Sequence, residues 1–250
     1  MMPRFKTLFF AAVALALVSL WPAAAKAGDT AGHQALGFSA NASHFAFVEF
    51  GSQAGSGAAY ANLYILDLAA DSYVGGSPFR VGGGENMDFT IATAIEQAKA
   101  DAASALSSFG IAMPALLAAA APPTQLNIDR KTASFHSIPV IPPLSRMIPT
   151  KLTLETFSLP GPDYCLEPTV TRGFAVRLTN GAETVEIHRD TSIPSSRGCA
   201  LNYEIGAVWI PVESQGNAAV ALISVISSGF EGQRSRRLAA IPLSLTGISN

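Results

Sequence analysis

The chain has 250 residues, of which 49% are hydrophobic and 14% are charged, and its formal net charge is −2. This mildly acidic balance, with no basic stripe, argues against nucleic acid or anionic lipid headgroups as partners. The length suits one domain or two small ones with a real core, and the many Gly and Pro residues favour short strands joined by turns.

An export signal is predicted at the N-terminus. Arg4 and Lys6 precede an apolar run of 13 residues from Leu8 to Leu20, and Ala25-Lys26-Ala27 is a small-x-small cleavage pattern. The run is shorter than the roughly 17 residues that span a bilayer, which disfavours an uncleaved anchor. We therefore expect residues 1–27 to be a signal peptide, no membrane span to remain after cleavage, and a periplasmic or secreted location.

Three short antiparallel strands are predicted between Leu36 and Tyr73. In the run from His44 to Phe50, apolar side chains occupy both faces, which is typical of a strand buried on two sides. A second run, Ala59 to Leu68, follows the glycine-rich loop Gly51 to Ala58. This run alternates two sets of side chains, namely Ala61, Leu63 and Ile65 on one face and Tyr60, Asn62, Tyr64 and Leu66 on the other.

One amphipathic helix is predicted after the glycines at 82–84. Its N-cap candidates are Asn86, Asp88 and Thr90, and Gly110 is a natural stop. The apolar stripe recurs at steps of three and four residues, at Ile91, Ile95, Ala98, Ala102, Leu106 and Phe109. The alanine-rich segment from Ile111 to Ala121 is expected to be a second short helix or a packed connector.

A proline-rich stretch, residues 122–150, is expected to separate two halves. Its six prolines exclude helix through most of the stretch and leave edge strands and extended connector. The first half, 28–121, would hold the meander and the helix. The second half, 151–250, is expected to be an antiparallel β region, and the two halves could also form one domain.

Strand patterns dominate the second half. Alternating runs surround Asn180-Gly181, a dipeptide that favours a tight hairpin turn. Further strands are predicted at 152–159, 203–212, 218–227 and 237–245.

The two cysteines, Cys165 and Cys199, predict a single disulfide, because export places them in an oxidising compartment. It would close a loop of about 35 residues and stabilise the fold by roughly 3–4 kcal/mol. Two unpaired buried thiols are the alternative. With no C-x-x-C and no His at ligand spacing, we expect no metal site and no cofactor.

The candidate binding residues are Arg172, His188, Asp190 and Arg197. The planar guanidinium of Arg197 suits bidentate contact with a carboxylate or another anion. In the alternative interpretation, the disulfide orders this loop and Arg197 pairs with Asp190 or with carbonyl groups. His188 and Asp190 lie two positions apart, but no G-x-S-x-G elbow is present, so no catalytic residue is assigned.

A cluster of charges near the C-terminus is interpreted as solvated loop residues, with a partner-docking surface as the alternative. Its members are Glu231, Arg234, Arg236 and Arg237.

Residues 36–73 resemble a single blade of the TolB-like propellers. A propeller needs at least about four blades, and one clear copy supports only a local meander. The chain also resembles, over its full length, a family of predicted secreted bacterial proteins of unknown function. Three segments carry this resemblance: Gly37 to Leu68, Asp190 to Cys199 with Tyr203, and Gly229 to Gly232 with Arg236-Arg237. The resemblance implies export and no particular activity.

These observations predict a mainly β fold with one central α-helix, in which two antiparallel meanders pack as a sandwich or as small sheets and form no full propeller. The expected function is that of an exported periplasmic protein, non-catalytic, that binds a small ligand or an envelope protein. A hydrolase acting on envelope or secreted material is the alternative.

Overall fold

The computed structural model describes residues 28–84, 86, 88–125, 128–136, 149–165, 170–213, 218–229 and 232–245. The expected signal peptide, three of the six prolines of the connector and Glu231 lie outside the described residues.

The described strands form three antiparallel sheets. The N-terminal sheet has the order β4-β3-β2-β1-β6, with β5 also paired to β3. Its strands are β1 (Gly32–Ser39), β2 (His44–Ser52), β3 (Ala59–Asp67), β4 (Ser72–Tyr73), β5 (Phe79–Gly82) and β6 (Ile111–Met113). The central sheet has the order β14-β13-β12-β7, from β7 (Ala115–Ala120), β12 (Ala200–Pro211), β13 (Ala218–Ser228) and β14 (Arg234–Ser244). The outer sheet has the order β11-β10-β9-β8, from β8 (Thr132–Phe135), β9 (Thr150–Ser158), β10 (Arg172–Asn180) and β11 (Glu183–Arg189).

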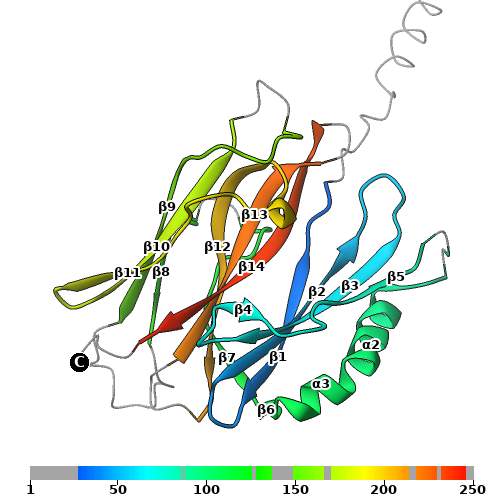
Figure 1. The fold of residues 1–250 in the computed structure, drawn as a ribbon, viewed down its shortest axis with the longest axis horizontal. Helices are drawn as coiled ribbons and strands as arrows, with labels where there is room; N and C mark the ends of the chain where they lie inside the picture. The colour runs from blue at the N-terminus through cyan, green and yellow to red at the C-terminus, as the bar shows by residue number, and fades with distance from the viewer. Residues whose placement is uncertain are drawn as a thin grey trace, which may run out of the picture.

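The sheets stack as layers, and the helices cover the free face of the N-terminal sheet (Figure 1). The central sheet lies between the other two and packs an apolar core against each. Its strand β13 is accordingly buried along nearly its whole length, on both faces. This arrangement confirms the expected sandwich of antiparallel sheets, with three sheets in place of two meanders.

The two faces of the N-terminal sheet have different neighbours, as the sequence alternation predicts. Ala61, Leu63 and Ile65 of β3 pack against the helices, and the opposite face of the sheet turns toward the central sheet. On β2, residues Phe45 to Glu49 are all buried, which confirms a strand covered on both sides.

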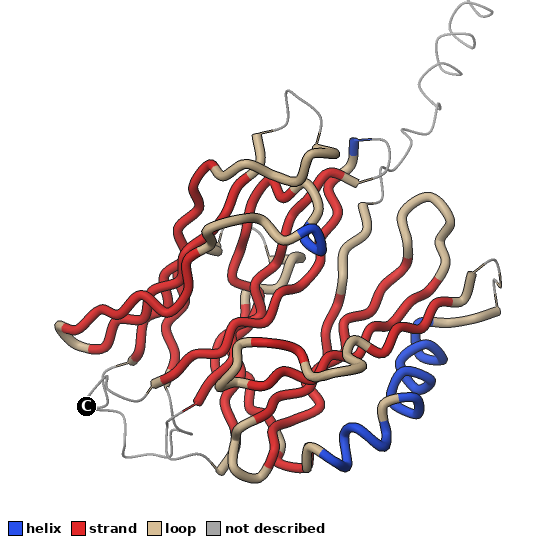
Figure 2. Tube along the Cα trace, in the orientation of Figure 1, coloured by secondary structure: helices blue, strands red, loops and turns tan. Residues whose placement is uncertain are grey.

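The predicted helix is present as two consecutive segments, α2 (Ile91–Asp101) and α3 (Ala103–Ser108). Thr90 is the N-cap and accepts a hydrogen bond from the Thr93 amide. Amide-to-carbonyl bonds from Ala102 to Ala98 and from Leu106 to Ala102 continue across the junction. The apolar stripe is therefore continuous. In Figure 2, α2 and α3 lie together on one side of the molecule, and the short turn η1 (Ser195–Arg197) lies apart from them.

The expectation of a helix or packed connector at 111–121 is wrong. The segment forms β6, which pairs with β1, and β7, which pairs with β12, with Pro114 between them. Pairing with two different sheets supplies backbone hydrogen bonds and packing that outweigh the weak strand preference of alanine. Because it changes sheet at Pro114, this segment joins the N-terminal sheet to the central sheet.

The second half has the strands that the alternation predicts. β10 and β11 form a hairpin through Asn180-Gly181, where Gly181 has a φ of 57°. This left-handed conformation favours glycine. β8, from the proline-rich stretch, is an edge strand of the outer sheet, as expected of that region. Cys165 and Cys199 form the predicted disulfide, with their Cα atoms 5.5 Å apart.

Candidate functional site

A cleft of about 1000 Å³ opens between the N-terminal sheet and strand β14 of the central sheet. One wall is the face of β3 that carries Tyr60, Asn62, Tyr64 and Leu66. The opposite wall is formed by residues 237–241 of β14, and the rim by His188 and the loop 194–198 around η1. At the other end of the same sheet interface, Phe38, Phe45 and Phe47 fill the space between the layers. The interface thus changes from apolar core to polar cleft along its length.

Strand register places three polar residues in one row across the N-terminal sheet. Glu49 of β2 lies opposite Asn62 of β3, which lies opposite Arg80 of β5. Residues directly opposite in neighbouring strands point to the same face, so all three face the cleft side. The Asn62 side-chain amide donates to Glu49 Oε1 at 3.2 Å. This bond fixes the orientation of Asn62.

Arg237 of β14 reaches across from the opposite wall. Its Nη2 donates to Asp29 Oδ2 at 2.6 Å, and its Nη1 lies 3.6 Å from Glu49 Oε1. The guanidinium carbon lies 4.2 Å from the centre of the Tyr60 ring, a distance suited to a cation–π contact. The Tyr60 hydroxyl donates to Asp29 Oδ1 at 3.2 Å. Two carboxylates and one ring therefore hold Arg237 in place.

Glycine at position 51 gives the Tyr60 ring its space. Gly51 lies opposite Tyr60 in register, and a Cβ there would lie only 2.8 Å from the Tyr60 hydroxyl oxygen. Any side chain at this position would displace the ring that supports Arg237.

Glu49 is a buried carboxyl group with both oxygens engaged. Besides the Asn62 contact, its Oε2 accepts a hydrogen bond from the Leu238 amide at 2.7 Å. Burial raises the pKa of Glu49 above its ordinary value, although the Leu238 amide, Arg237 and Asn62 each act to lower it. Glu49 thus links the two walls from beneath the cleft surface.

At the rim, Asp190 collects hydrogen bonds from three groups. Arg197 Nη1 lies 2.8 Å from both carboxylate oxygens, the Phe174 amide donates to Oδ2 at 2.9 Å, and His188 Nε2 lies 3.0 Å from Oδ1. Burial alone would raise the pKa of Asp190, but these three hydrogen bonds and the Arg197 charge hold it below its ordinary value.

The loop that carries Arg197 is held from several sides. The guanidinium lies over the rings of Phe174 and Tyr203, with its carbon 4.8 Å and 5.7 Å from their centres. The disulfide anchors the loop at Cys199, and the Tyr164 hydroxyl donates to the Ser195 carbonyl at 3.0 Å. Covalent and polar contacts together fix the position of the cleft rim.

Three of the four residues predicted from the sequence lie together, and the fourth lies apart. His188 and Arg197 line the cleft, and Asp190 supports both from below. Arg172, at the start of β10, does not line it. The Arg197–Asp190 pair is the contact expected from the alternative interpretation, in which the disulfide orders this loop. A binding role for these residues stays a proposal.

Sequence patterns do not predict the other polar residues of the cleft as site residues, and they predict Arg237 to be a solvated loop charge. That assignment is wrong for Arg236 and Arg237, because both lie on β14 and pair with carboxylates, Arg236 with Glu204 at 2.9 Å. A signal was available for Glu49, since it is the one carboxylate in the doubly apolar run from His44 to Phe50.

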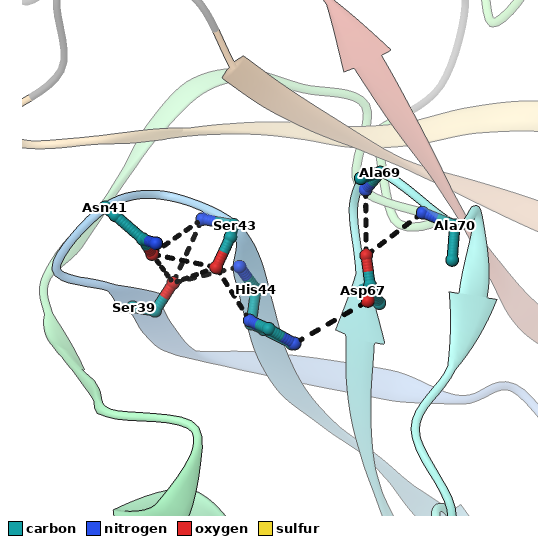
Figure 3. Close-up of polar contacts among 7 residues, drawn as sticks. All are labelled: Ser39, Asn41, Ser43, His44, Asp67, Ala69 and Ala70. Atoms are coloured by element: carbon teal, nitrogen blue, oxygen red, sulfur yellow. Dashed lines mark hydrogen bonds and ion pairs between the residues drawn. The ribbon is translucent and has the colours of Figure 1, made fainter.

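A second polar cluster lies outside the cleft, at the turn between β1 and β2 (Figure 3). Asn41 Oδ1 accepts from the hydroxyl of Ser39 at 2.9 Å, and from the hydroxyl and amide of Ser43 at 2.8 and 3.2 Å. The Ser43 hydroxyl also lies 2.8 Å from His44 Nδ1, and His44 Nε2 is 3.8 Å from Asp67 Oδ2.

These residues include a serine, a histidine and an aspartate, the residue types of a hydrolase triad. The His44–Asp67 distance is too long for the hydrogen bond that orients a triad histidine. Asp67 instead accepts the amides of Ala69 and Ala70, at 2.9 and 3.0 Å, which closes the turn after β3. The contacts in Figure 3 are those of two turn-stabilising networks.

No group of three or more His, Cys, Asp or Glu side chains suited to a metal ion occurs in the described part of the chain. Among the helices of that part, none has both the length and the apolar character needed to cross a membrane.

Comparison with known families matches residues 46–243 to the family described as "Predicted secreted protein (DUF2259)". The chain belongs to this family. The family match covers every residue that lines the cleft, from Glu49 to Ile241. Asp29, which holds Arg237, lies before it. Searches of curated proteins and of solved structures gave no match. DUF2259 membership agrees with the predicted export of the protein and is silent on binding or catalysis.

Proposed function

We propose that this protein is an exported, periplasmic binding protein that holds a small polar ligand in the cleft without converting it. The cleft itself carries the proposal. Its volume of about 1000 Å³ lies at the upper end of the roughly 300–1000 Å³ that is usual for small-molecule sites. Its walls combine tyrosine rings with a small set of fixed polar groups, which is the usual composition of such sites.

The polar groups are positioned before any ligand arrives. Arg237 is held by Asp29 and Tyr60, and the disulfide anchors the loop of Arg197. A site whose side chains are already ordered loses less conformational entropy on binding, and this favours affinity. Preorganisation on two sheets and a cross-linked loop supports a binding role.

The contacts of His188 favour binding over hydrolysis. Within the described part of the chain, its ring has one hydrogen-bond partner, Asp190. A serine hydrolase requires a nucleophile within hydrogen-bond reach of the histidine. The hydrolase alternative therefore has weaker support than the binding role.

A panel of probes with variants that fill the cleft tests the proposal. The purified exported protein is titrated by isothermal calorimetry with glucose, glucuronate, glucose 6-phosphate, N-acetylglucosamine, succinate and arginine. Ser72→Trp and Ser196→Trp each add a bulky ring at an exposed residue that lines the cleft. The matched control is Ser104→Trp, on the exposed side of α3 and outside the cleft.

We expect at least one probe to bind the wild type, to be lost in both cleft variants and to be retained by the control. Binding that is insensitive to Ser72→Trp and Ser196→Trp, or no binding by any probe, would refute the proposal. Mass spectrometry of the bound probe after prolonged incubation tests the non-catalytic part. A changed probe mass would favour the hydrolase.

A further inference from the structure

The end of the cleft between β5 and β14 carries two arginines whose hydrogen-bonding capacity is largely unused. A guanidinium group has five N–H donors. Arg80 lines the cleft and is exposed, and its side chain has no ion pair or hydrogen bond with any described residue. Arg237 uses Nη2 for Asp29, and its Nη1, which is buried, lies 3.6 Å from Glu49 Oε1 without a hydrogen-bond partner.

The carboxylates at this end cannot serve a ligand, because the protein already uses them. Glu49 accepts from Asn62 and from the Leu238 amide, one bond to each oxygen. Asp29 likewise accepts from Tyr60 and from Arg237. Both carboxylates are buried, with 1% and 6% of their surface exposed. The accessible charged groups at this end are therefore guanidinium groups, since Arg80 is exposed and 37% of the Arg237 side chain is exposed.

The two arginines act on one place. Arg80 of β5 lies opposite Asn62 of β3, which is two positions from Tyr60 on the same face of that strand. Arg237 lies over the Tyr60 ring. Burial raises the pKa of Tyr64, as do Glu49 and Tyr73, whereas Arg80 and Arg237 each act to lower it. Two guanidinium groups from opposite walls thus face the space above Tyr60 and Tyr64.

We propose that the cleft ligand carries an anionic group, a carboxylate or a phosphate, and that Arg80 and Arg237 bind it from opposite walls. The inference rests on the proposed binding function and specifies the chemistry of its ligand. Arg237 is the fixed member, held by Asp29, and Arg80 is the adaptable one on a short edge strand. Charge-assisted hydrogen bonds from a guanidinium to such groups are short, directional and often bidentate.

Three probes that share one sugar ring isolate the charged group. Glucose, glucuronate and glucose 6-phosphate differ in having a hydroxymethyl, a carboxylate or a phosphate at the same carbon. Calorimetry with the wild type is expected to give at least about tenfold tighter binding of one anionic sugar than of glucose. The preferred anion then distinguishes carboxylate from phosphate recognition.

The variants Arg80→Gln and Arg80→Lys test the assigned residue without touching the buried pairs. We expect Arg80→Gln to weaken binding of the preferred anion about tenfold, and Arg80→Lys to weaken it less, since it keeps the charge and loses the planar fork. The control is Arg234→Gln, which removes an exposed charge from β14 outside the cleft. It should change affinity less than about twofold.

Equal affinity for glucose and both anionic sugars, failure of both anions to bind, or equal effects of Arg80→Gln and Arg234→Gln would overturn the inference. These outcomes remain separable from failure of the binding function. If glucose binds the wild type as tightly as the anionic sugars and no longer binds Ser72→Trp, the binding role is preserved and the anionic ligand is refuted.

Discussion

The Glu49 carboxylate of β2 accepts a hydrogen bond from the Leu238 amide of β14 at 2.7 Å, although the two residues are 189 positions apart in the chain. β14 is an edge strand, and unpaired amides along such an edge can pair with other chains. Three amides on its outer side nevertheless donate hydrogen bonds. The Arg236 amide donates to the Asp29 carbonyl, the Leu238 amide to Glu49, and the Ala240 amide to the Tyr73 hydroxyl. Groups around the N-terminal sheet thus take the place of a missing strand and close one end of the cleft.

Replacing Glu49 by Gln should change how stability depends on pH. Burial raises the pKa of Glu49 in the folded protein above its ordinary value of 4.5. The folded state therefore retains this proton while the unfolded chain loses it, and stability falls as the pH rises from 4.5 through the folded pKa. Urea denaturation between about pH 4 and pH 8 should show this decline in the wild type relative to Glu49→Gln.

Glu96→Gln, at an exposed site on α2, is the matched control for that comparison. Its stability difference from the wild type should change far less with pH. A Glu49→Gln difference that stays constant with pH would contradict the assigned cause.

Replacing Asp190 by Asn should destabilise the fold at neutral pH by about 3–5 kcal/mol, because Arg197, whose side chain is only 13% exposed, would lose its carboxylate partner. The folded pKa of Asp190 lies below its ordinary value of 3.8, so its stabilising contribution is present above 3.8 and is lost as the pH falls through the folded pKa. The difference between variant and wild type should therefore shrink in acid.

Denaturation curves at about pH 7 and pH 3 measure this difference. Asp163→Asn, an exposed aspartate between the outer-sheet strands β9 and β10, should stay within about 0.5 kcal/mol of the wild type at both values. An Asp190→Asn cost that is equally large in acid would exclude the ion pair as its source.

Removing the disulfide should destabilise the protein by about 3–4 kcal/mol on the chain-entropy model, since the bridge spans 34 positions. The double variant Cys165→Ser/Cys199→Ser and the reduced wild type should agree in urea denaturation. Intact mass under non-reducing conditions should lie about two mass units below that of the reduced chain. Equal masses would show that the bridge does not form.

Replacing Asn41 by Ala should cost about 1–2 kcal/mol and leave cleft binding unchanged, because Asn41 accepts three hydrogen bonds within the β1–β2 turn. Asn86→Ala is a graded control, since Asn86 Oδ1 accepts a single amide. Thermal unfolding and probe calorimetry on the same samples separate the two effects. Loss of probe binding in Asn41→Ala without loss of stability would assign the Figure 3 network a functional role.

Local patterns in the chain already specified much of the fold. The two-residue period of a strand places Tyr60, Asn62 and Tyr64 on one face of β3, and that face became a wall of the cleft. With two cysteines in an exported chain, only one intramolecular pairing is possible, and it forms. The loop that this bridge holds was the strongest candidate for a site, and two of the four residues predicted around it line the cleft.

Local patterns did not specify what each face would contact. The alanine-rich composition of the segment 111–121 predicts a helix or a connector. The segment forms strands because it pairs with β1 and β12. Sequence patterns predict a solvated charge at Arg237, because its partner, Asp29, lies 208 positions away and no local pattern indicates their contact.

The sequence by itself therefore determined the strand-rich class, the disulfide and which side chains share a strand face. The class and the shared faces depend on neighbours a few residues apart, and two cysteines allow a single intramolecular pairing. Tertiary structure decided the order of the layers, the burial of Glu49 and the placement of Arg80 and Arg237 along one cleft. Those features depend on long-range packing between strands far apart in the chain, and the period of one strand carries no information about its distant partner.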